Sequence, residues 1–178
     1  MTATNEPTDA GPLASTTGTW QLDSSASTVE LHTKAMWGLA TVKAVFKAAG
    51  GGGTVGDDGS VAGTLVIDAS SVDTKSKKRD THLRGSDFFE VEIYPTFTYT
   101  ATGARPATGN QVTVTGTLTV HGESRPLDVP VTVTEAGPNQ VLVTGEVEID
   151  RSKWGLTWAK MGARVINRVT VAAVFTRA

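Results

Sequence analysis

Apolar and polar residues alternate with a period of two over much of the chain. Between residues 112 and 120, valine or leucine occupies one face while threonine occupies the other. The same alternation recurs over residues 127–133, 141–149 and 165–175, and more weakly around 29–31, 42–46, 61–67 and 97–99. Such alternation is typical of strands that bury one face, so the pattern predicts about eight strands.

The connections between these strands are short and rich in turn-forming residues. Asp, Asn, Pro and Gly gather at 57–59, 107–110, 121–123 and 137–139. Short turns of this kind join antiparallel neighbours. A sheet with one apolar face needs a cover, and the sequence contains no amphipathic helix long enough to supply one. Closure solves the problem, so we predict an all-β fold: an eight-stranded antiparallel lipocalin-like barrel.

The inward positions of this barrel carry mainly small side chains. Val, Ala, Gly and Leu dominate the apolar faces, and Gly63, Gly116 and Gly145 are expected to point inward. Residues of this size cannot fill an eight-stranded lumen, so we expect an apolar cavity. Strands of about eleven residues would make the barrel roughly 28 Å tall. A cavity of that shape favours a long, thin, apolar guest.

Two segments interrupt the strand pattern. The first, residues 73–95, reads DTKSKKRDTHLRGSDFFEVEIYP and holds five basic residues within ten positions. Thr74 or Ser76 can cap a short helix around residues 76–86, and the turn that follows contains Phe88 and Phe89. The second segment, residues 151–163, reads RSKWGLTWAKMGA and holds two tryptophans. Both segments are predicted to connect strands at a barrel end.

These segments carry a family resemblance. SVDTKSKKRDTHLRGSDFFEVEIYP, followed by GTLTVHG at 116–122 and RSKWG at 151–155, resembles the YceI-like family of bacterial polyisoprenoid-binding, lipocalin-like proteins, and TWQLDSSASTVEL resembles that family's first strand. The resemblance covers nearly all of residues 19–178. It implies an extended eight-stranded barrel that binds a long isoprenoid lipid, such as a quinone tail, in its lumen. The family's common histidines near the first strand are replaced here by Ala26 and Ala35, which implies a different head-group contact.

We expect the ligand to contact inward residues of the strands and bulky residues of the connections. These are Trp37, Phe46, Leu65, Ile67, Arg79, His82, Leu83, Phe88, Phe89, Phe97, Tyr99, Leu118, Trp154, Trp158 and Met161. A second set is expected to be structural: Asp80, Arg84, Asp87, Pro95 and Arg151. For the aromatic residues, contact with the ligand and packing of the barrel end are both open interpretations.

The charged residues of the predicted helix also allow two interpretations. In one, Arg79, His82 or a nearby lysine meets a polar or anionic head group at the lumen entrance. In the other, which we favour, the helix plugs the barrel end and Arg79 forms a buried pair with Asp80. Asp80 and Arg84 stand four apart, a spacing that allows a surface ion pair, and Leu83 is expected to face the barrel mouth.

Composition narrows the chemistry. The net charge of −2 and pI of about 5.9 argue against a nucleic-acid partner. The chain has no cysteine, which excludes disulfides and thiolate chemistry. Its three histidines lack metal-ligand spacing, and no nucleophile-elbow or phosphate-loop motif occurs. We therefore expect no metal, no catalytic residue and no cofactor other than a bound isoprenoid lipid.

The N-terminal region differs from the rest of the chain. Residues 1–18 are rich in Thr, Ala, Pro and Gly, so we expect a disordered tail before a single domain at 19–178. The chain shows no signal-peptide pattern, no lipidation cysteine and no run of about 18 apolar residues. These observations predict a cytoplasmic protein without a transmembrane segment. The sequence leaves a homodimer open.

We expect the protein to be a carrier, storage or sequestering protein for a polyprenyl or isoprenoid-quinone lipid, not an enzyme. One alternative is a protein-interaction module whose lumen is filled, although the Thr-rich outer faces argue against a large interface. A less favoured alternative is an enzyme that acts on a lipid at the barrel mouth. Arg79, Asp80 and His82 would then be the only dense group of candidates.

Overall fold

The structure, a computed structural model, describes residues 11–178. It consists of one antiparallel sheet, a single α-helix and short 3₁₀ turns. The strands are β1 (Gly18–Leu22), β2 (Thr28–Ala35), β3 (Ala40–Val55), β4 (Val61–Asp73), β5 (Thr96–Pro106), β6 (Gln111–Val120), β7 (Glu123–Pro126), β8 (Val129–Gly137), β9 (Gln140–Asp150) and β10 (Ile166–Arg177). The helix is α1 (Lys77–Arg84), and the 3₁₀ turns are η1 (Gly11–Thr16), η2 (Ser24–Ala26), η3 (Met36–Gly38), η4 (Arg151–Trp154) and η5 (Lys160–Gly162).

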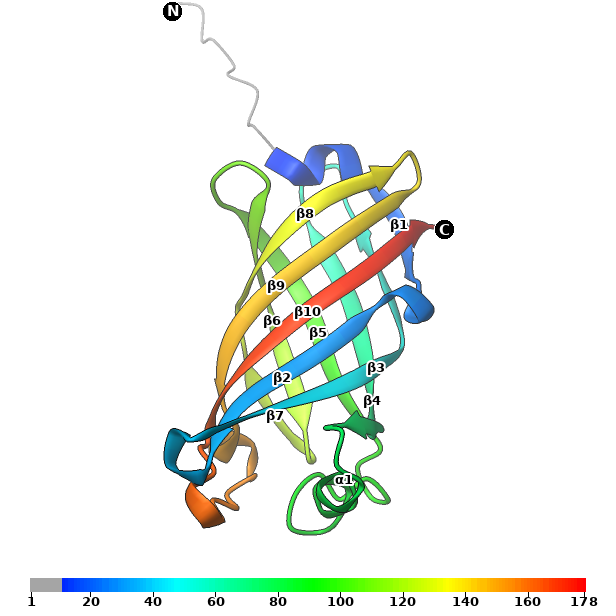
Figure 1. The fold of residues 1–178 in the computed structure, drawn as a ribbon. Coiled ribbons are helices and arrows are strands. Elements are labelled where there is room, and N and C mark those ends of the chain that lie inside the picture. Colours follow the sequence, from blue (N-terminus) through cyan, green and yellow to red (C-terminus); the bar gives the residue numbers. More distant parts are fainter. Residues whose placement is uncertain (1–10) are drawn as a thin grey trace, which may run out of the picture.

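The sheet closes on itself. Its hydrogen-bonded order runs β10-β2-β3-β4-β5-β6-β8-β9, and β9 pairs back with β10, so eight strands form a ring (Figure 1). This ring confirms the predicted eight-stranded antiparallel barrel. The two further strands, β1 and β7, each continue the position of one of the eight ring strands. β1 pairs with β10 and β3 beyond the end of β2, and β7 pairs with the part of β6 that β8 does not reach.

A row of small residues crosses one wall of the barrel. Gly53 on β3 lies opposite Gly63 on β4, Gly63 lies opposite Ala101 on β5, and Ala101 lies opposite Gly116 on β6. Directly opposed residues share a face of the sheet. A Cβ added to Gly53 would lie only 2.6 Å from the carbonyl oxygen of Ala62, so the strand requires glycine there. Gly53, Gly63 and Ala101 of this row border open space inside the barrel.

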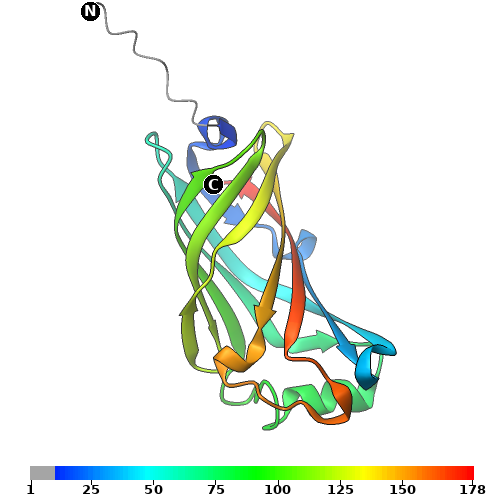
Figure 2. The ribbon, with the colours of Figure 1, turned by 90° about the vertical axis from the view of Figure 1, so that its left-hand side faces the viewer.

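The two ends of the barrel are built differently (Figures 1 and 2). One end, here called the α1 end, carries α1, η3, η4 and η5. The other, here called the terminal end, carries η1 and the C-terminus. Leu13 of η1 is buried there beside Val112 and Val131. Ordered structure therefore begins before the predicted boundary at Thr19, while the disorder expected for residues 1–10 lies outside the described residues.

The α1 connection follows the predicted plan. Ser76 caps the helix by accepting a hydrogen bond from the Arg79 amide at 3.3 Å. The chain then turns through Phe88 and Phe89, which are both buried, and reaches β5 after Pro95. The Pro95 carbonyl accepts a 3.0 Å hydrogen bond from the Ala69 amide, which joins the end of the connection to β4. Within residues 11–178, no helix has the length and apolar character needed to cross a membrane.

Candidate functional site

The barrel interior contains two adjoining apolar cavities. The terminal cavity, at the terminal end, has a volume of about 260 Å³. The α1 cavity, at the α1 end, has a volume of about 400 Å³. Val29, Leu118, Ile149 and Val169 line both cavities, so the two are neighbouring parts of one lumen. The predicted hollow, apolar interior is therefore present in the structure.

Most residues expected to contact a ligand line this lumen. In the terminal cavity these are Leu65, Ile67, Tyr99 and Leu118. In the α1 cavity they are Phe46, Arg79, His82, Leu83, Phe88, Phe89, Phe97, Leu118, Trp154, Trp158 and Met161. Trp37 does not line either cavity. Its side chain is 78% exposed and packs over Gly162, where an added Cβ would lie 2.9 Å from the ring. The neighbouring Met36 lines the α1 cavity instead.

The inward glycines differ in what they leave open. Gly63 and Gly145 line the terminal cavity, as expected. Beside Gly116 the space is taken by Tyr99, whose ring would lie 2.8 Å from an added Cβ. The Tyr99 hydroxyl donates a 2.8 Å hydrogen bond to the Leu127 carbonyl. Burial raises the pKa of Tyr99 to about 12, with a smaller contribution from the Asp128 charge. Tyr99 is therefore a neutral, hydrogen-bonded part of the wall.

An aromatic cluster forms the wall of the α1 cavity. The ring centroids of Phe46, Phe89 and Phe97 lie 5.0–5.8 Å apart in edge-on arrangements. Phe88 lies 6.0 Å from Phe89 and 5.3 Å from Trp158. Edge-to-face contacts at these distances stabilise aromatic packing beyond the area that the rings bury. The cluster packs the end of the barrel and lines the cavity as well, so the two interpretations of these residues are compatible.

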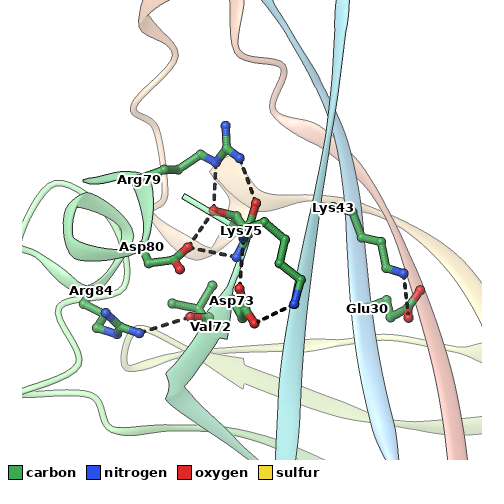
Figure 3. A network of polar contacts seen from close by, with 9 residues as sticks. Glu30, Lys43, Val72, Asp73, Lys75, Arg79, Asp80 and Arg84 are labelled. Atoms are coloured by element: carbon green, nitrogen blue, oxygen red, sulfur yellow. Dashed lines mark hydrogen bonds and ion pairs between the residues drawn. The ribbon is translucent and has the colours of Figure 1, made fainter. Parts of the chain in front are cut away.

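The charged residues of α1 form a network that the sequence did not predict (Figure 3). Asp80 is buried and accepts hydrogen bonds from the Thr74 amide at 2.9 Å and the Thr74 hydroxyl at 2.6 Å. Arg79 donates to the same hydroxyl at 2.9 Å and to the Thr74 carbonyl at 2.9 Å. Thr74 therefore bridges Arg79 and Asp80, whereas we had expected these two residues to pair directly.

Arg84 also departs from expectation. It does not form the surface pair with Asp80 but donates to the carbonyl of Ser70 at 2.9 Å. It also donates to the carbonyl of Val72 at 3.1 Å (Figure 3). The pair that the spacing allows does not form, because both side chains find backbone partners in the segment before the helix. Arg84 thus fastens the C-terminal end of α1 to the end of β4. This is a structural role, although a different one from that predicted.

His82 belongs to the wall of the α1 cavity. Its Nε2 atom lies 3.3 Å from Oδ2 of Asp87, and its ring contacts Trp158 and Phe88 at centroid distances of 4.9 and 5.6 Å. Asp87 therefore orients the imidazole against the aromatic cluster. No group of three or more His, Asp or Glu side chains among the described residues could hold a metal ion. His82 can offer a ligand one polar edge within an aromatic surround.

Arg151 organises the second connection. It is buried and donates to the carbonyls of Leu156 at 2.6 Å and Arg164 at 3.1 Å. Its guanidinium also lies over the Phe88 ring, 5.2 Å from the centroid. Burial lowers the pKa of Arg151, and the charge of Asp150 opposes that shift. Trp154 donates a 2.9 Å hydrogen bond from its indole nitrogen to the Leu118 carbonyl, so both side chains hold this connection against the barrel.

Sequence reasoning missed Asn167, a buried polar residue that lines the α1 cavity. Its side chain is 2% exposed and its Oδ1 atom has no hydrogen-bond partner, whereas its amide nitrogen lies 3.4 Å from the Val165 carbonyl. A signal was present, because Asn167 occupies an inward position in the alternation of Val165, Val169 and Val171. Lys160 and Arg164 also line this cavity and were not predicted.

The α1 cavity has a marked charge bias. Arg79, Arg151, Lys160 and Arg164 line it, together with His82. None of the described residues that line it is Asp or Glu. The terminal cavity contains no charged residue in its described lining. The lumen therefore runs from a wholly uncharged end to an end that presents cations and one unpaired amide oxygen.

Comparison with known proteins explains this architecture. The family model for the YceI-like domain matches residues 20–176, nearly all of the barrel. The chain belongs to the YceI-like family. In the YceI-like relative of Escherichia coli O157:H7, Protein YceI, 38% of residues are identical over 63 positions, which cover 35% of this chain and 32% of that protein. A UPF0312 protein of Pseudomonas aeruginosa is 38% identical over 65 residues, 36% of this chain and 34% of that protein.

Solved structures share the YceI-like fold. Burkholderia cenocepacia BcnA superposes with a TM-score of 0.78 at 24% identity, over 86% of this chain and 98% of that chain. A polyisoprenoid binding domain from Saccharophagus degradans gives a TM-score of 0.70 at 19% identity, over 89% of this chain and 98% of that chain. The curated sequence relatives are matched over only about a third of their own length. In this YceI-like chain, Ala35 lines the α1 cavity.

Proposed function

We propose that this chain binds a long isoprenoid lipid, of the polyprenyl or isoprenoid-quinone type, lengthwise in its lumen as a carrier, storage or sequestering protein. The observation that carries the proposal is the pair of adjoining apolar cavities, of about 260 and 400 Å³, inside one narrow barrel. Small-molecule sites typically have volumes of about 300–1,000 Å³ and mostly apolar walls. Membership of the YceI-like family and the fold shared with a polyisoprenoid binding domain support the same ligand class.

The polarity of the lumen supports one direction for the ligand. A methyl-branched hydrocarbon tail finds no charged group in the terminal cavity, so the tail belongs there. The head group belongs in the α1 cavity, where Arg79, His82 and Asn167 face it. An unpaired buried acceptor such as Asn167 Oδ1 costs about 1–3 kcal/mol, and a ligand hydroxyl would relieve that cost. A prenol or a quinol supplies such a hydroxyl.

Binding in this mode requires no catalysis. The dense polar group on α1 is occupied in positioning the helix, because Arg79 and Asp80 both bond Thr74. This favours a carrier over an enzyme that acts at the mouth. The open cavities likewise favour a carrier over an interaction module with a filled lumen. A cytoplasmic location is part of the same proposal.

The first experiment identifies the ligand. Protein purified without detergent would be analysed by native mass spectrometry and, after organic extraction, by lipid mass spectrometry. We expect a one-to-one complex with a lipid that contains a repeated isoprene unit. Repeated recovery of protein that carries no lipid, together with failure to bind an added prenol, would contradict the proposal.

The second experiment tests the head-group position. Asn167→Leu removes the unpaired oxygen and keeps the side chain close in size. We expect it to bind a saturated hydrocarbon and a prenol of equal length with similar affinity, whereas the unaltered protein should prefer the prenol about fivefold to tenfold. Val171→Leu, at an inward position of the same strand that lines only the terminal cavity, is the control. Equal preference in all three proteins would place the head group elsewhere.

A further inference from the structure

A group of exposed apolar side chains lies along one side of the α1 end of the barrel. Residues 36–39 and 160–164, here called the rim, are brought together where η3 contacts η5, as both views of the ribbon show (Figures 1 and 2). Trp37 and Leu39 are 78% and 87% exposed, and Met36 and Met161 are 50% and 70% exposed. Clustered apolar side chains on a protein surface mark an interaction site more often than isolated ones do.

The backbone of the rim holds these side chains in an unusual conformation. Met36, Trp37 and Met161 have φ values of 50°, 56° and 57°. Left-handed conformations at such bulky residues cost on the order of 1 kcal/mol or more each, and they gather at functional positions. Each turn continues into a glycine, Gly38 or Gly162, that also has positive φ. The backbone is therefore strained in both turns of the rim, although Trp37 remains exposed to solvent.

The two chain segments that carry the rim are basic. Residues 33–43 and 151–164 contain six Lys or Arg residues and no Asp or Glu, although the chain as a whole has a net charge of −2. Lys34, Lys153, Lys160 and Arg164 are exposed there. One cation, Lys43, is partly neutralised by Glu30 on β2 at 3.3 Å. The rim thus combines exposed apolar side chains with a local excess of positive charge.

We propose that the rim docks the α1 end of the barrel onto the surface of an anionic lipid bilayer. Tryptophan and leucine enter the headgroup region, and lysine and arginine beside them are attracted to anionic lipids. The α1 cavity, which Met36, Lys160, Met161 and Arg164 line, would then face the bilayer. A second copy of the chain is a poorer occupant, because its own basic rim would be repelled. The docking itself does not depend on the proposed function. Its purpose, lipid exchange, does rest on that function.

Vesicle flotation tests the docking directly. The probes are vesicles of pure phosphatidylcholine and of phosphatidylcholine with 30 mol% phosphatidylglycerol, a composition of about that proportion being enough to give a negative surface. We expect the protein to float with the anionic vesicles and to be released by about 0.5 M salt, which screens exposed charges. No flotation with either vesicle, or equal flotation with both, would overturn the proposal.

Two substitution pairs locate the contact. Trp37→Ser with Leu39→Ser removes the two most exposed apolar side chains, neither of which lines a cavity, and should weaken anionic-vesicle binding at least about tenfold. Ile93→Ser, at an apolar residue that is 62% exposed outside the rim, is the control and should bind as before. Lys34→Gln should weaken binding about fivefold, whereas Arg105→Gln near the terminal end should not. Unchanged binding of the Trp37 and Leu39 variant would refute the proposed contact.

Prenol binding by the same variants separates this proposal from the proposed function. Prenol binding that persists without vesicle binding would refute docking alone, and vesicle binding without prenol binding would refute the lipid carrier alone. Brominated lipids should quench the tryptophan emission of the unaltered protein more than that of Trp37→Phe. Equal quenching would place Trp37 outside the bilayer. A dimer in light scattering that the Trp37 and Leu39 variant abolishes would assign the rim to a second copy and overturn the membrane assignment.

Discussion

Replacing Ala101 by phenylalanine would shorten the terminal cavity from within. Ala101 lines this cavity and lies opposite Gly63, which lines it too, so an added ring would project into the lumen. The α1 cavity, which Ala101 does not line, keeps its shape. The variant therefore blocks the place proposed for the end of an isoprenoid tail without touching the head-group end.

The size of the effect follows from the hydrocarbon that the ring displaces. A phenyl ring takes up about the length of one isoprene unit in so narrow a lumen. With about 0.8 kcal/mol for each buried carbon, a displaced five-carbon unit forfeits roughly 4 kcal/mol of transfer free energy. The displaced unit regains conformational entropy, which offsets part of this loss of transfer free energy. The net loss is about 2 kcal/mol, or about 30-fold in Kd for a long prenol. A short prenol that ends before Ala101 should lose nothing.

The assay is equilibrium dialysis of a series of prenols of increasing chain length, with bound lipid measured by mass spectrometry. The control is Thr100→Phe, which adds the same side chain at an exposed position of the same strand, on the outer face. Urea unfolding of both variants checks that the barrel remains intact. Equal losses for short and long prenols, or the same loss in the control, would refute lengthwise binding with the tail at the terminal end.

Three further predictions concern stability. Burial raises the native pKa of Tyr99 from 10.0 to about 12, so the native state keeps the phenol proton at a pH where the unfolded state loses it. The stability that Tyr99 contributes is therefore complete below pH 10 and is lost as the pH rises from about 10 to 12. Over that range, urea unfolding should show a loss of up to roughly 2 kcal/mol in the free energy of unfolding, which Tyr99→Phe should not show. Arg151→Met should lower the free energy of unfolding by about 2–4 kcal/mol, since the carbonyls of Leu156 and Arg164 lose their buried donor, and an unchanged urea midpoint would contradict this role. Leu13→Ala should lower the free energy of unfolding by about 2 kcal/mol, and a loss near zero would mean that η1 contributes no packing.

The alternation of side chains was enough to predict a ring of eight strands. It did not predict that two positions in the ring are each shared by two strands. A period of two assigns faces without regard to which partner a strand meets, so the shared positions of β1 with β2 and of β7 with β8 needed the tertiary structure. The buried, ordered position of Leu13 was not predicted, for a related reason. A single apolar residue in a Pro- and Gly-rich segment gives no periodic signal, and only the open end of the barrel supplies its neighbours.

The site residues divide along the same line. Inward strand residues such as Leu65 and Phe97 could be predicted, because parity alone decides which face they take. Trp37 could not, because its exposure depends on a left-handed turn and on the close approach of Gly162. The bridge of Arg79 and Asp80 through Thr74 also depends on local geometry, because no sequence spacing indicates that Thr74 bonds both side chains.

The pairing of β10 has a consequence for the order of events during synthesis. This strand, the last in the chain, pairs with β9 before it but also with β2 and β1 from the beginning of the chain. The ring therefore cannot close until β10 has left the ribosome. Until then β2 and β9 present open edges, and the long sequence separation of the closing contacts favours slow folding. Loss of residues 166–177 would thus cost the barrel its seam rather than one peripheral strand.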